Sequence, residues 1–326
     1  MKIFLHKRAA DRIGEALGAT GLPLELLTVD DDGAFALDGK PIEVEAVRPD
    51  IVWLSLDAFA TKQSKLFLDK AAESGAVRMM QSCVAGLDLP VFRRIFEQGT
   101  KLANSDAQAI AIAEYVVANV VAEWHPIAEQ RKAQSERQWR RVPFRELSQS
   151  RWLIVGFGKI GQEIARRVKP FGAHVTGIRR NMAPHAAADE MAALSDLRRF
   201  LPAADVVVLA AGLNDATRDL AGADFFTAMK PGAFFVNIGR GDLVDEAALL
   251  GALDHGTPSV AILDVFRTEP LPPDSPFWAH PRIRLTPHSA SGGDGTRGRG
   301  DSLFLTNLKR FAAGERLVNE VDERSF

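Results

Sequence analysis

Short apolar runs that alternate with helix-like segments constrain this chain more than any other feature of its sequence. From residue 151 onward the apolar runs are RWLIVGFG, AHVTGIRR, ADVVVLAAG, GAFFVNIGR, SVAILDVF and IRLTPHS, each with helical sequence beside it. Strands that are buried on both faces read as continuous apolar runs, and intervening helices let successive strands pair in parallel. The second half of the chain is therefore predicted to form a doubly wound parallel sheet.

The first hundred residues show the same alternation over a shorter length. KIFLH (2–6), PDIVWLSL (49–56) and VRMMQSCVAG (77–86) are strand-like, and helix-like sequence lies between them. A chain of 326 residues has the length expected of two domains. We therefore predict an α/β protein with two doubly wound parallel-sheet domains. Residues 103–289 are predicted to form one of these domains, and residues 1–102 with 290–326 the other, smaller and discontinuous one.

Two segments near the domain boundaries carry further expectations. We predict one unusually long helix from about Asp106 into the 130s. Its first part is apolar and its second part is charged, which suits a helix that begins in one domain core and continues onto another surface. The segment SGGDGTRGRGD (291–301) is rich in glycine, and each interior glycine costs a helix roughly 0.5–1 kcal/mol relative to alanine. This segment is therefore expected to be flexible. The helix-like LFLTNLKRFAAG that follows it is expected to return to the first domain.

Charge and cysteine content exclude several classes of protein. Forty basic residues against forty-two acidic ones give a net charge of -2, which leaves no basic field for nucleic acid or an anionic membrane. One cysteine, Cys83, can form no internal disulfide and is too few for a Cys/His metal cage, so no metal is expected. Apolar stretches such as 205–213 fall short of the roughly 20 residues that cross a bilayer. A cytoplasmic protein without nucleic-acid or membrane partners is expected.

The segment GFGKIG, residues 156–161, follows the apolar strand WLIV and opens a helix-like stretch. In a dinucleotide site Gly156 permits the tight turn, Gly158 lets a pyrophosphate approach the backbone, and Gly161 lets helix and strand pack closely. A glycine turn that serves geometry alone is the alternative. The strand–turn–helix context favours a cofactor loop, to which Phe157, Lys159 and Ile160 also belong.

Arg179 and Arg180 follow the next strand, at the position where an NAD-selective site presents a carboxylate to the ribose hydroxyls. Guanidinium groups instead pair with a 2′-phosphate. This substitution favours NADP(H), with NAD(H) as the other candidate. A solvated arginine pair at a strand end is the alternative interpretation.

Three motifs lie at the C-terminal ends of the last strands predicted in the second half of the chain. They place Arg240 in NIGRGDLVDE, Glu269 in LDVFRTEPLP and His288 in TPHSA. Singly, these residues read as a surface ion-pair partner, a solvated acid and a buried histidine. Together they supply what the reduction of a 2-keto acid needs: a cation for the substrate, a proton donor that titrates near neutrality, and a carboxylate that orients the donor and keeps it protonated.

At these residues the chain resembles the D-isomer-specific 2-hydroxyacid dehydrogenases. The family pattern NxGRGxxVxExAL…ALDVFxxEPLP…TPH is present almost unbroken from residue 237 to residue 288, and the resemblance extends to Asn104, to Glu114 and Tyr115, and to the closing NLKRFAAGERLVNEVD. The resemblance implies that Arg240 binds substrate. It also implies that Glu269 pairs with His288, which protonates the carbonyl oxygen as hydride arrives from the nicotinamide.

The resemblance implies further contacts in other loops. In VAGLD (84–88), the backbone N–H groups of Ala85 and Gly86 would receive the substrate carboxylate, although an ordinary glycine turn is the alternative. Asp264 matches a family residue near the nicotinamide carboxamide, or it caps the following turn. Further cofactor contacts are expected at Ala211, Gly212, Ile238, Gly239 and His288. The loop at 212–214 departs from the PLT-type segment of the family, which leaves its contacts open.

Residues 103–289 are accordingly expected to be a Rossmann dinucleotide-binding domain, and residues 1–102 with 290–326 a smaller, flavodoxin-like substrate domain. The implied activity is the reversible reduction of glyoxylate, hydroxypyruvate or a similar small 2-keto acid to the D-2-hydroxy acid. A homodimer is expected, because the predicted long helix carries more apolar surface than one domain edge needs, and related enzymes pair through this region. A nucleotide-sensing protein, like the corepressors that share this fold, is one alternative. A phosphoglycerate dehydrogenase-type enzyme is the other.

Overall fold

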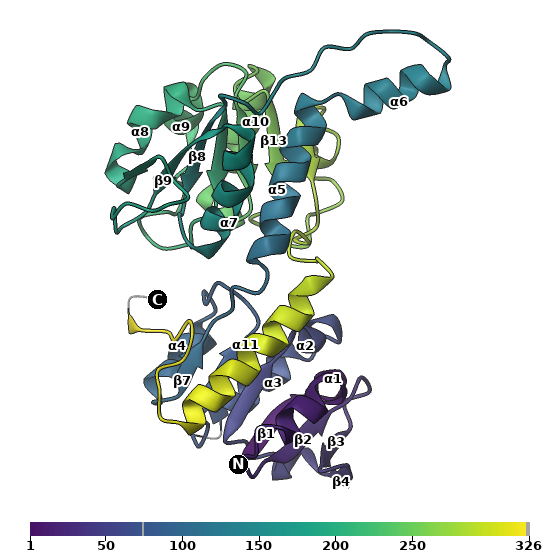
Figure 1. The fold of residues 1–326 in the computed structure, drawn as a ribbon, viewed down its shortest axis with the longest axis vertical. Helices are drawn as coiled ribbons and strands as arrows, with labels where there is room; N and C mark the ends of the chain where they lie inside the picture. Colours follow the sequence, from purple (N-terminus) through teal and green to yellow (C-terminus); the bar gives the residue numbers. More distant parts are fainter. Residues whose placement is uncertain (74, 324–326) are drawn as a thin grey trace. The chain divides into compact units, whose positions relative to one another are not determined.

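The computed structural model describes residues 1–73 and 75–323, and the chain forms two compact units (Figure 1). Unit 1 is Met1–Gln108 together with the chain from Asp294 onward, and unit 2 is Ala109–Gly293. The boundaries lie at 108/109 and 293/294 rather than at 102/103 and 289/290. Residues just after 102 stay with unit 1 because the Ser105 N–H donates to the Val84 carbonyl at 3.0 Å.

The sheet of unit 1 has the strand order β4-β3-β2-β1-β5-β6-β7. Its strands are β1 (Lys2–His6), β2 (Glu25–Val29), β3 (Phe35–Leu37), β4 (Lys40–Ile42), β5 (Ile51–Leu54), β6 (Met79–Ser82) and β7 (Lys101–Ala103). The order β2-β1-β5-β6-β7 is parallel and flavodoxin-like, as predicted. β3 and β4 add an antiparallel edge that the sequence analysis missed, because three-residue strands are too short to show a periodic pattern.

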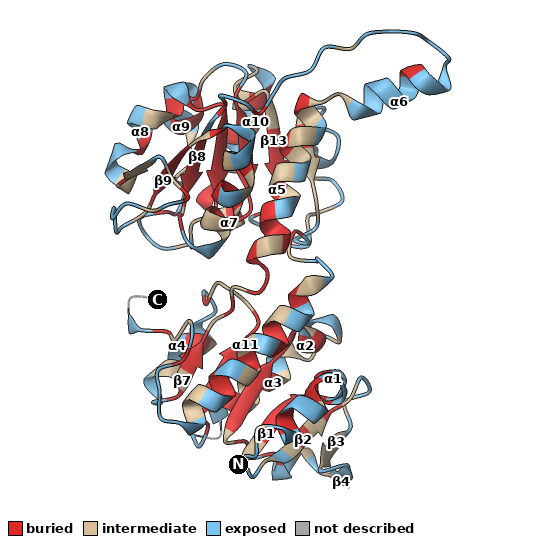
Figure 2. Cartoon of the chain, viewed as in Figure 1, coloured by how far each residue is buried: buried red, intermediate tan, exposed pale blue. Residues whose placement is uncertain are grey.

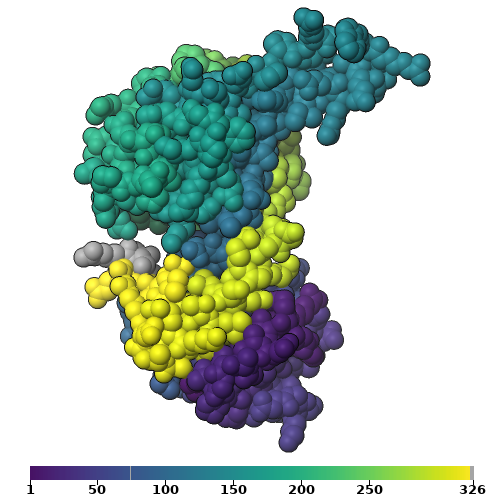
Figure 3. Space-filling model, in the orientation of Figure 1, coloured from purple at the N-terminus to yellow at the C-terminus, as the bar shows by residue number. Residues whose placement is uncertain are grey.

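The helices of unit 1 are α1 (Lys7–Gly18), α2 (Leu56–Ala60), α3 (Ser64–Glu73), α4 (Pro90–Glu97) and α11 (Gly295–Ala312). The N-terminal segment and the chain after residue 294 pack together here, since α11 lies against α1 (Figure 3). Residues 295–301 of the glycine-rich segment are helical, since α11 begins at Gly295, whose N–H donates to the Asp294 side chain, while the expected flexibility of 291–301 stays a prediction. Gly300 lies on the side of α11 that faces the buried Trp53, which stacks on Phe304, and a Cβ there would be in ordinary contact with that ring at 3.6 Å.

The sheet of unit 2 has the order β10-β9-β8-β11-β12-β13-β14, and its neighbouring strands pair in parallel. Its strands are β8 (Arg151–Val155), β9 (His174–Ile178), β10 (Glu190–Ala192), β11 (Val206–Leu209), β12 (Phe234–Asn237), β13 (Val260–Leu263) and β14 (Ile283–Leu285). The order is that of a Rossmann fold with a seventh strand at one edge, so the predicted doubly wound sheet is confirmed.

Helices α5 (Ala109–Trp124), α6 (Ile127–Ser135), α7 (Lys159–Val168), α8 (Leu197–Phe200), α9 (Ala223–Ala228) and α10 (Glu246–Asp254) belong to unit 2. Single 3₁₀ turns lie at Val44–Ala46, Lys169–Phe171, Leu194–Asp196, Leu201–Ala203, Gly241–Leu243 and Pro276–Trp278. Figure 2 shows that the buried residues of each unit concentrate in the strands and on the inner faces of the helices. No helix in the described ranges combines the length and the apolar character that crossing a bilayer requires.

The single long helix predicted from Asp106 into the 130s is wrong. The structure has two helices, α5 and α6, which are separated at His125 and Pro126. Proline has no N–H to donate and disfavours helical backbone in the residue before it, so α5 ends there. α5 packs on α7, whereas Ala133 is the only buried residue of α6.

Candidate active site

The loops that follow β8, β11, β12, β13 and β14 come together at one edge of the unit 2 sheet. All these strands are parallel, so their C-terminal ends point the same way. β8 lies between β9 and β11, which is where the strand order reverses direction. In open α/β sheets, ligands bind outside the C-terminal ends of the strands at this switch point.

The glycines of the loop after β8 have different surroundings. Gly156 has a φ of 94°, and a Cβ there would lie 2.3 Å from the Ala211 backbone nitrogen. A Cβ at Gly161 would lie 2.6 Å from the Gly156 carbonyl oxygen, whereas one at Gly158 would meet no atom within 4 Å. Packing therefore requires the first and third glycines. The second faces open space, at the point where a pyrophosphate would approach.

Helix α7 starts directly after Gly158 and has no side-chain cap at its N-terminus. The N-terminal end of a helix carries a partial positive charge and presents backbone amides, so it binds phosphate groups. This donor set and the open space at Gly158 fit a dinucleotide.

The other predicted cofactor residues occupy the same edge. The Phe157 ring is buried and fills the space beside Gly177, where a Cβ would lie 2.6 Å from the ring, so Phe157 contributes only backbone to the loop. A Cβ at Gly239 would lie 2.8 Å from the Ala211 carbonyl oxygen, so the loops after β11 and β12 are in close contact. The remaining predicted residues lie on these loops or at the start of α7: Lys159, Ile160, Gly212 and Ile238.

Arg179 and Arg180 directly follow β9. The Arg179 guanidinium donates to the carbonyls of Asn181 and, at 3.0 Å, Ala183, so it lies over its own loop. His185, which the sequence analysis did not single out, packs its ring edge-on against Phe157 with a centroid distance of 5.4 Å. Burial and the nearby Arg179 and Arg166 cations lower the pKa of His185 below its ordinary value. Two cations, Arg179 and Arg166, thus lie near His185 at this strand end.

The structure brings Glu269 and His288 together. Glu269 Oε2 accepts a hydrogen bond from His288 Nδ1 at 2.7 Å, while Glu269 Oε1 accepts one from the Phe266 N–H at 2.9 Å. Because a carboxylate only accepts, Nδ1 carries a proton and Nε2 is the ring nitrogen that faces away from Glu269. About half of the His288 side chain is exposed. Nε2 is therefore placed to exchange a proton with a bound molecule.

Arg240 lies in the loop after β12. Asn237 fixes this loop, because its side chain donates to the Arg240 carbonyl at 2.9 Å and accepts from the Gly239 N–H at 3.1 Å. The next residue, Gly241, touches the loop that leads to Glu269, since a Cβ there would lie 1.9 Å from the Phe266 carbonyl carbon. The loops that carry Arg240 and Glu269 are thus packed directly against each other.

Asp264 caps the turn that carries His288. Its carboxylate is buried and accepts hydrogen bonds from the backbone N–H groups of Ser289 at 2.8 Å and Ala290 at 3.1 Å. Its own carbonyl accepts from the His288 N–H at 2.9 Å. Asp264 thus caps the turn at 288–290 rather than the turn that follows it in the sequence, and its place near the nicotinamide stays a prediction.

Comparison with known proteins agrees with this geometry. The family model described as D-isomer specific 2-hydroxyacid dehydrogenase, NAD binding domain, matches residues 117–290, which is more than half of the chain and lies inside unit 2. This chain belongs to that dehydrogenase family.

Three relatives illustrate the similarity. A glyoxylate reductase/hydroxypyruvate reductase of Mus musculus is 39% identical over 178 residues, which span 54% of each chain. A family member from Aeromonas salmonicida is 30% identical, with a TM-score of 0.81 over 98% of both chains. Another, from Xanthobacter autotrophicus in complex with NADPH and MES, is 27% identical, with a TM-score of 0.76 over the whole of both chains.

Ala85 and Gly86 belong to unit 1, where they follow β6 at the C-terminal edge of its sheet. Asn104 Nδ2 donates to the Ala85 carbonyl at 2.9 Å and so holds this loop. Within the described ranges, the N–H groups of Ala85 and Gly86 donate no hydrogen bond. Two neighbouring amides are thus available for an anion.

The two glycines of the cofactor loop generate a prediction about the NAD-binding domain. The Gly158→Ala variant is expected to keep wild-type stability without cofactor, within about 0.5 kcal/mol, and to bind NAD(P)H at least about tenfold more weakly, because the methyl group occupies the pyrophosphate space. The matched variant Gly156→Ala is expected to lose about 1–3 kcal/mol of unfolding free energy through backbone strain and overlap. Urea unfolding of the apoprotein and fluorescence titration with NADPH and NADH measure both effects. Wild-type cofactor affinity in Gly158→Ala would contradict the site.

Proposed function

We propose that the protein reduces a small 2-keto acid, such as glyoxylate or hydroxypyruvate, to the D-2-hydroxy acid with NADPH, in a reversible reaction. The observation that carries this proposal is the 2.7 Å contact between Glu269 Oε2 and His288 Nδ1 at the C-terminal edge of a dinucleotide-binding sheet. The Arg240 loop packs beside it. A proton donor, its orienting carboxylate and a cation are what reduction of a keto acid requires beyond a hydride source.

Each of these side chains has one task in the proposed reaction. The bound nicotinamide supplies a hydride to the carbonyl carbon of the substrate. His288 gives its Nε2 proton to the carbonyl oxygen as negative charge develops there. Glu269 accepts the Nδ1 hydrogen bond, which fixes the ring and stabilises the imidazolium before transfer. Arg240 supplies positive charge for the substrate carboxylate and the polarised carbonyl.

Unit 1 is assigned as the substrate domain. Its loop at Ala85 and Gly86 offers two backbone N–H donors, which suit the oxygen atoms of a carboxylate. Unit 2 is assigned as the dinucleotide domain, with the loops after β8, β11 and β12 around the cofactor.

NADPH is assigned as the preferred cofactor because positive charge gathers after β9. Arg179 and Arg180 stand where a carboxylate would select the ribose of NAD, and Arg166 adds a third cation near His185. The Xanthobacter autotrophicus relative was solved with NADPH.

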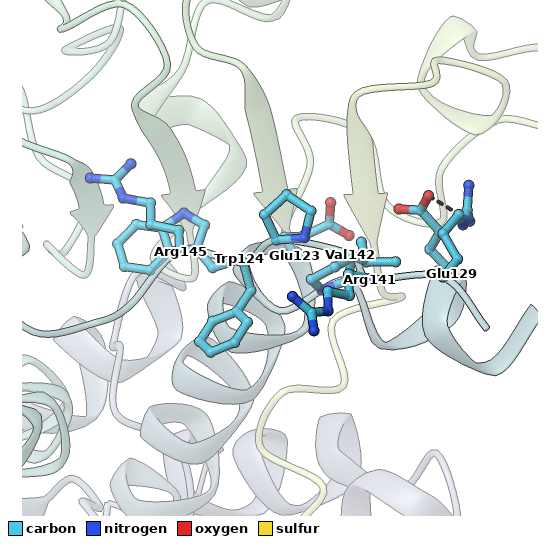
Figure 4. A pocket seen from close by; sticks show the side chains of 10 residues that line it. Glu123, Trp124, Glu129, Arg141, Val142 and Arg145 are labelled. Carbon is cyan, nitrogen blue, oxygen red and sulfur yellow. Dashed lines mark ion pairs between the residues drawn. The ribbon is translucent and has the colours of Figure 1, made fainter. Parts of the chain in front are cut away.

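We assign a homodimer as the assembly. Its interface is α6 together with residues 136–146, which we call the arm. The arm projects from the rest of unit 2 (Figure 3). It exposes Trp139 fully and Phe144 by half, and beside it lies a hollow of about 430 Å³ lined by Trp124, Pro143 and charged residues (Figure 4). A nine-residue helix is marginal by itself in water, so α6 needs a partner surface. A protruding aromatic and a hollow on one element are self-complementary under two-fold symmetry.

Steady-state kinetics with a panel of keto acids tests the proposed activity. Glyoxylate, hydroxypyruvate, pyruvate and 3-phosphohydroxypyruvate are each assayed with NADPH and NADH by absorbance at 340 nm. The highest kcat/KM is expected for a small unphosphorylated keto acid with NADPH. In the variant with Arg179→Ala and Arg180→Ala, the NADPH-to-NADH ratio of kcat/KM should fall about tenfold or more, since each lost charge-assisted hydrogen bond is worth about 1.5–3 kcal/mol.

Different outcomes of the panel separate the alternatives. The highest kcat/KM for 3-phosphohydroxypyruvate would indicate a phosphoglycerate dehydrogenase. Cofactor binding without turnover of any keto acid would indicate a nucleotide-sensing protein. An unchanged cofactor ratio in the double-arginine variant would remove the charge argument for NADPH.

The dimer is tested by sedimentation velocity at micromolar concentration. The wild type is expected to sediment as a dimer and Trp139→Glu as a monomer, because a buried unpaired carboxylate opposes association. Phe171→Glu, which changes a half-exposed aromatic of unit 2 outside the arm, is the matched control and should remain dimeric. A monomeric wild-type protein would refute the assembly.

A further inference from the structure

A chain of hydrogen bonds connects helix α5 to the loop that carries His288. Tyr115, on α5, has its hydroxyl oxygen 2.8 Å from Thr286 Oγ1, and Thr286 Oγ1 donates to Asp264 Oδ1 at 2.6 Å. All three residues belong to unit 2. The proposed catalytic roles make no use of Tyr115 or Thr286.

The direction of these hydrogen bonds follows from the number of protons. The Asp264 carboxylate only accepts, and the Thr286 hydroxyl has one proton, which goes to Asp264. The Tyr115 hydroxyl must therefore be the donor to Thr286, which requires the phenol to be protonated. Burial raises the pKa of Tyr115 above its ordinary value, and the negative charge of Asp264 adds to that effect. The phenol thus keeps its proton throughout the neutral range.

The backbone at His288 needs external support. His288 has a φ of 50°, in the left-handed region that side chains other than glycine rarely adopt, at a cost of about 1–2 kcal/mol. The contacts that hold it there lead to Asp264, whose carboxylate binds the N–H groups of Ser289 and Ala290 and whose carbonyl binds the N–H of His288. Thr286 donates to Asp264 Oδ1, the oxygen that also accepts from the Ser289 N–H, and Tyr115 holds the Thr286 hydroxyl in turn.

We propose that Tyr115 is a positioning residue for the reaction. Its hydroxyl acts through Thr286 and Asp264 to keep the 286–290 loop in the conformation in which the His288 imidazole meets Glu269. Tyr115 touches neither reacting atom. Its kinetic effect rests on the proposed function, whereas its effect on the loop does not.

Hydrogen exchange measured by mass spectrometry tests the effect on the loop without substrate or cofactor. Tyr115→Phe removes only the hydroxyl and keeps the ring, so the fold of α5 is retained. Peptides that contain residues 286–290 are expected to exchange faster in this variant, because the amides of His288, Ser289 and Ala290 lose rigid acceptors. Asn119→Ala is the matched control, since its side chain bonds one turn back to the Tyr115 carbonyl. Wild-type exchange is expected in the control.

Kinetics with the best keto acid of the panel tests the effect on the reaction. Tyr115→Phe is expected to lower kcat by about 5- to 50-fold, with the KM for NADPH unchanged, because small misplacements of a catalytic group cost up to about 100-fold. In a Thr286→Val background, which already breaks the chain, Tyr115→Phe is expected to have no further effect on kcat.

Three results would overturn the proposal: unchanged exchange at 286–290 in Tyr115→Phe, wild-type kcat in that variant, or the same fold loss of kcat in both backgrounds. If no keto acid is turned over, the proposed activity fails but the exchange experiment still decides the role of Tyr115 in the loop.

Discussion

The close approach of backbone loops at one edge of the unit 2 sheet is the constraint on which the rest of the site depends. Gly156 and Gly239 each lie so close to residue Ala211 that any side chain would overlap its backbone, and Gly241 stands in the same relation to Phe266. Protein interiors are too densely packed to absorb such overlaps cheaply. The backbones that carry Arg240 and Glu269 are therefore positioned by contacts between loops, and the Glu269 side chain is then held by its hydrogen bonds with the Phe266 N–H and His288 Nδ1.

The backbone of His288, at the same edge of the sheet, is strained and is kept in this conformation by packing and hydrogen bonds. His288 has a left-handed backbone conformation. The buried Asp264 carboxylate accepts hydrogen bonds from the N–H groups of the two residues that follow His288. Burying a carboxylate costs free energy unless it is hydrogen-bonded. The hydrogen bonds to Asp264 therefore stabilise the turn at residues 288–290. The His288 ring then lies where Glu269 can accept its Nδ1 hydrogen bond. Stored backbone strain of this kind is typical of functional sites.

Much of the fold could be predicted because buried parallel strands leave a clear apolar pattern. The catalytic motifs were likewise recognisable, since Arg240, Glu269 and His288 each follow such a strand. The long helix was wrong because apolar content predicts helix across residues 109–135, while a single proline at 126 decides where it breaks.

Other features had no local signal. Gly295, Gly298 and Gly300 are helical despite their low helix propensity, in a helix that packs on α1 and buries Gly300 beside Trp53. His185 and the Tyr115–Thr286 hydrogen bond depend on residues far apart in the sequence, the latter pair separated by 171 positions. The sequence alone shows no periodicity or motif that would predict the contact of His185 with Phe157 or of Tyr115 with Thr286.

The central claim is that Glu269 and His288 act as one unit that delivers a proton, and a double-mutant cycle on kcat tests it most directly. His288→Ala is expected to lower kcat by roughly 10²–10⁴-fold, the usual contribution of a general acid. Glu269→Gln should lower kcat in the wild-type background and have no further effect when His288 is already alanine, because its task is performed only through that ring. An equal fold loss from Glu269→Gln in both backgrounds would show that the two residues act independently, and would contradict the account.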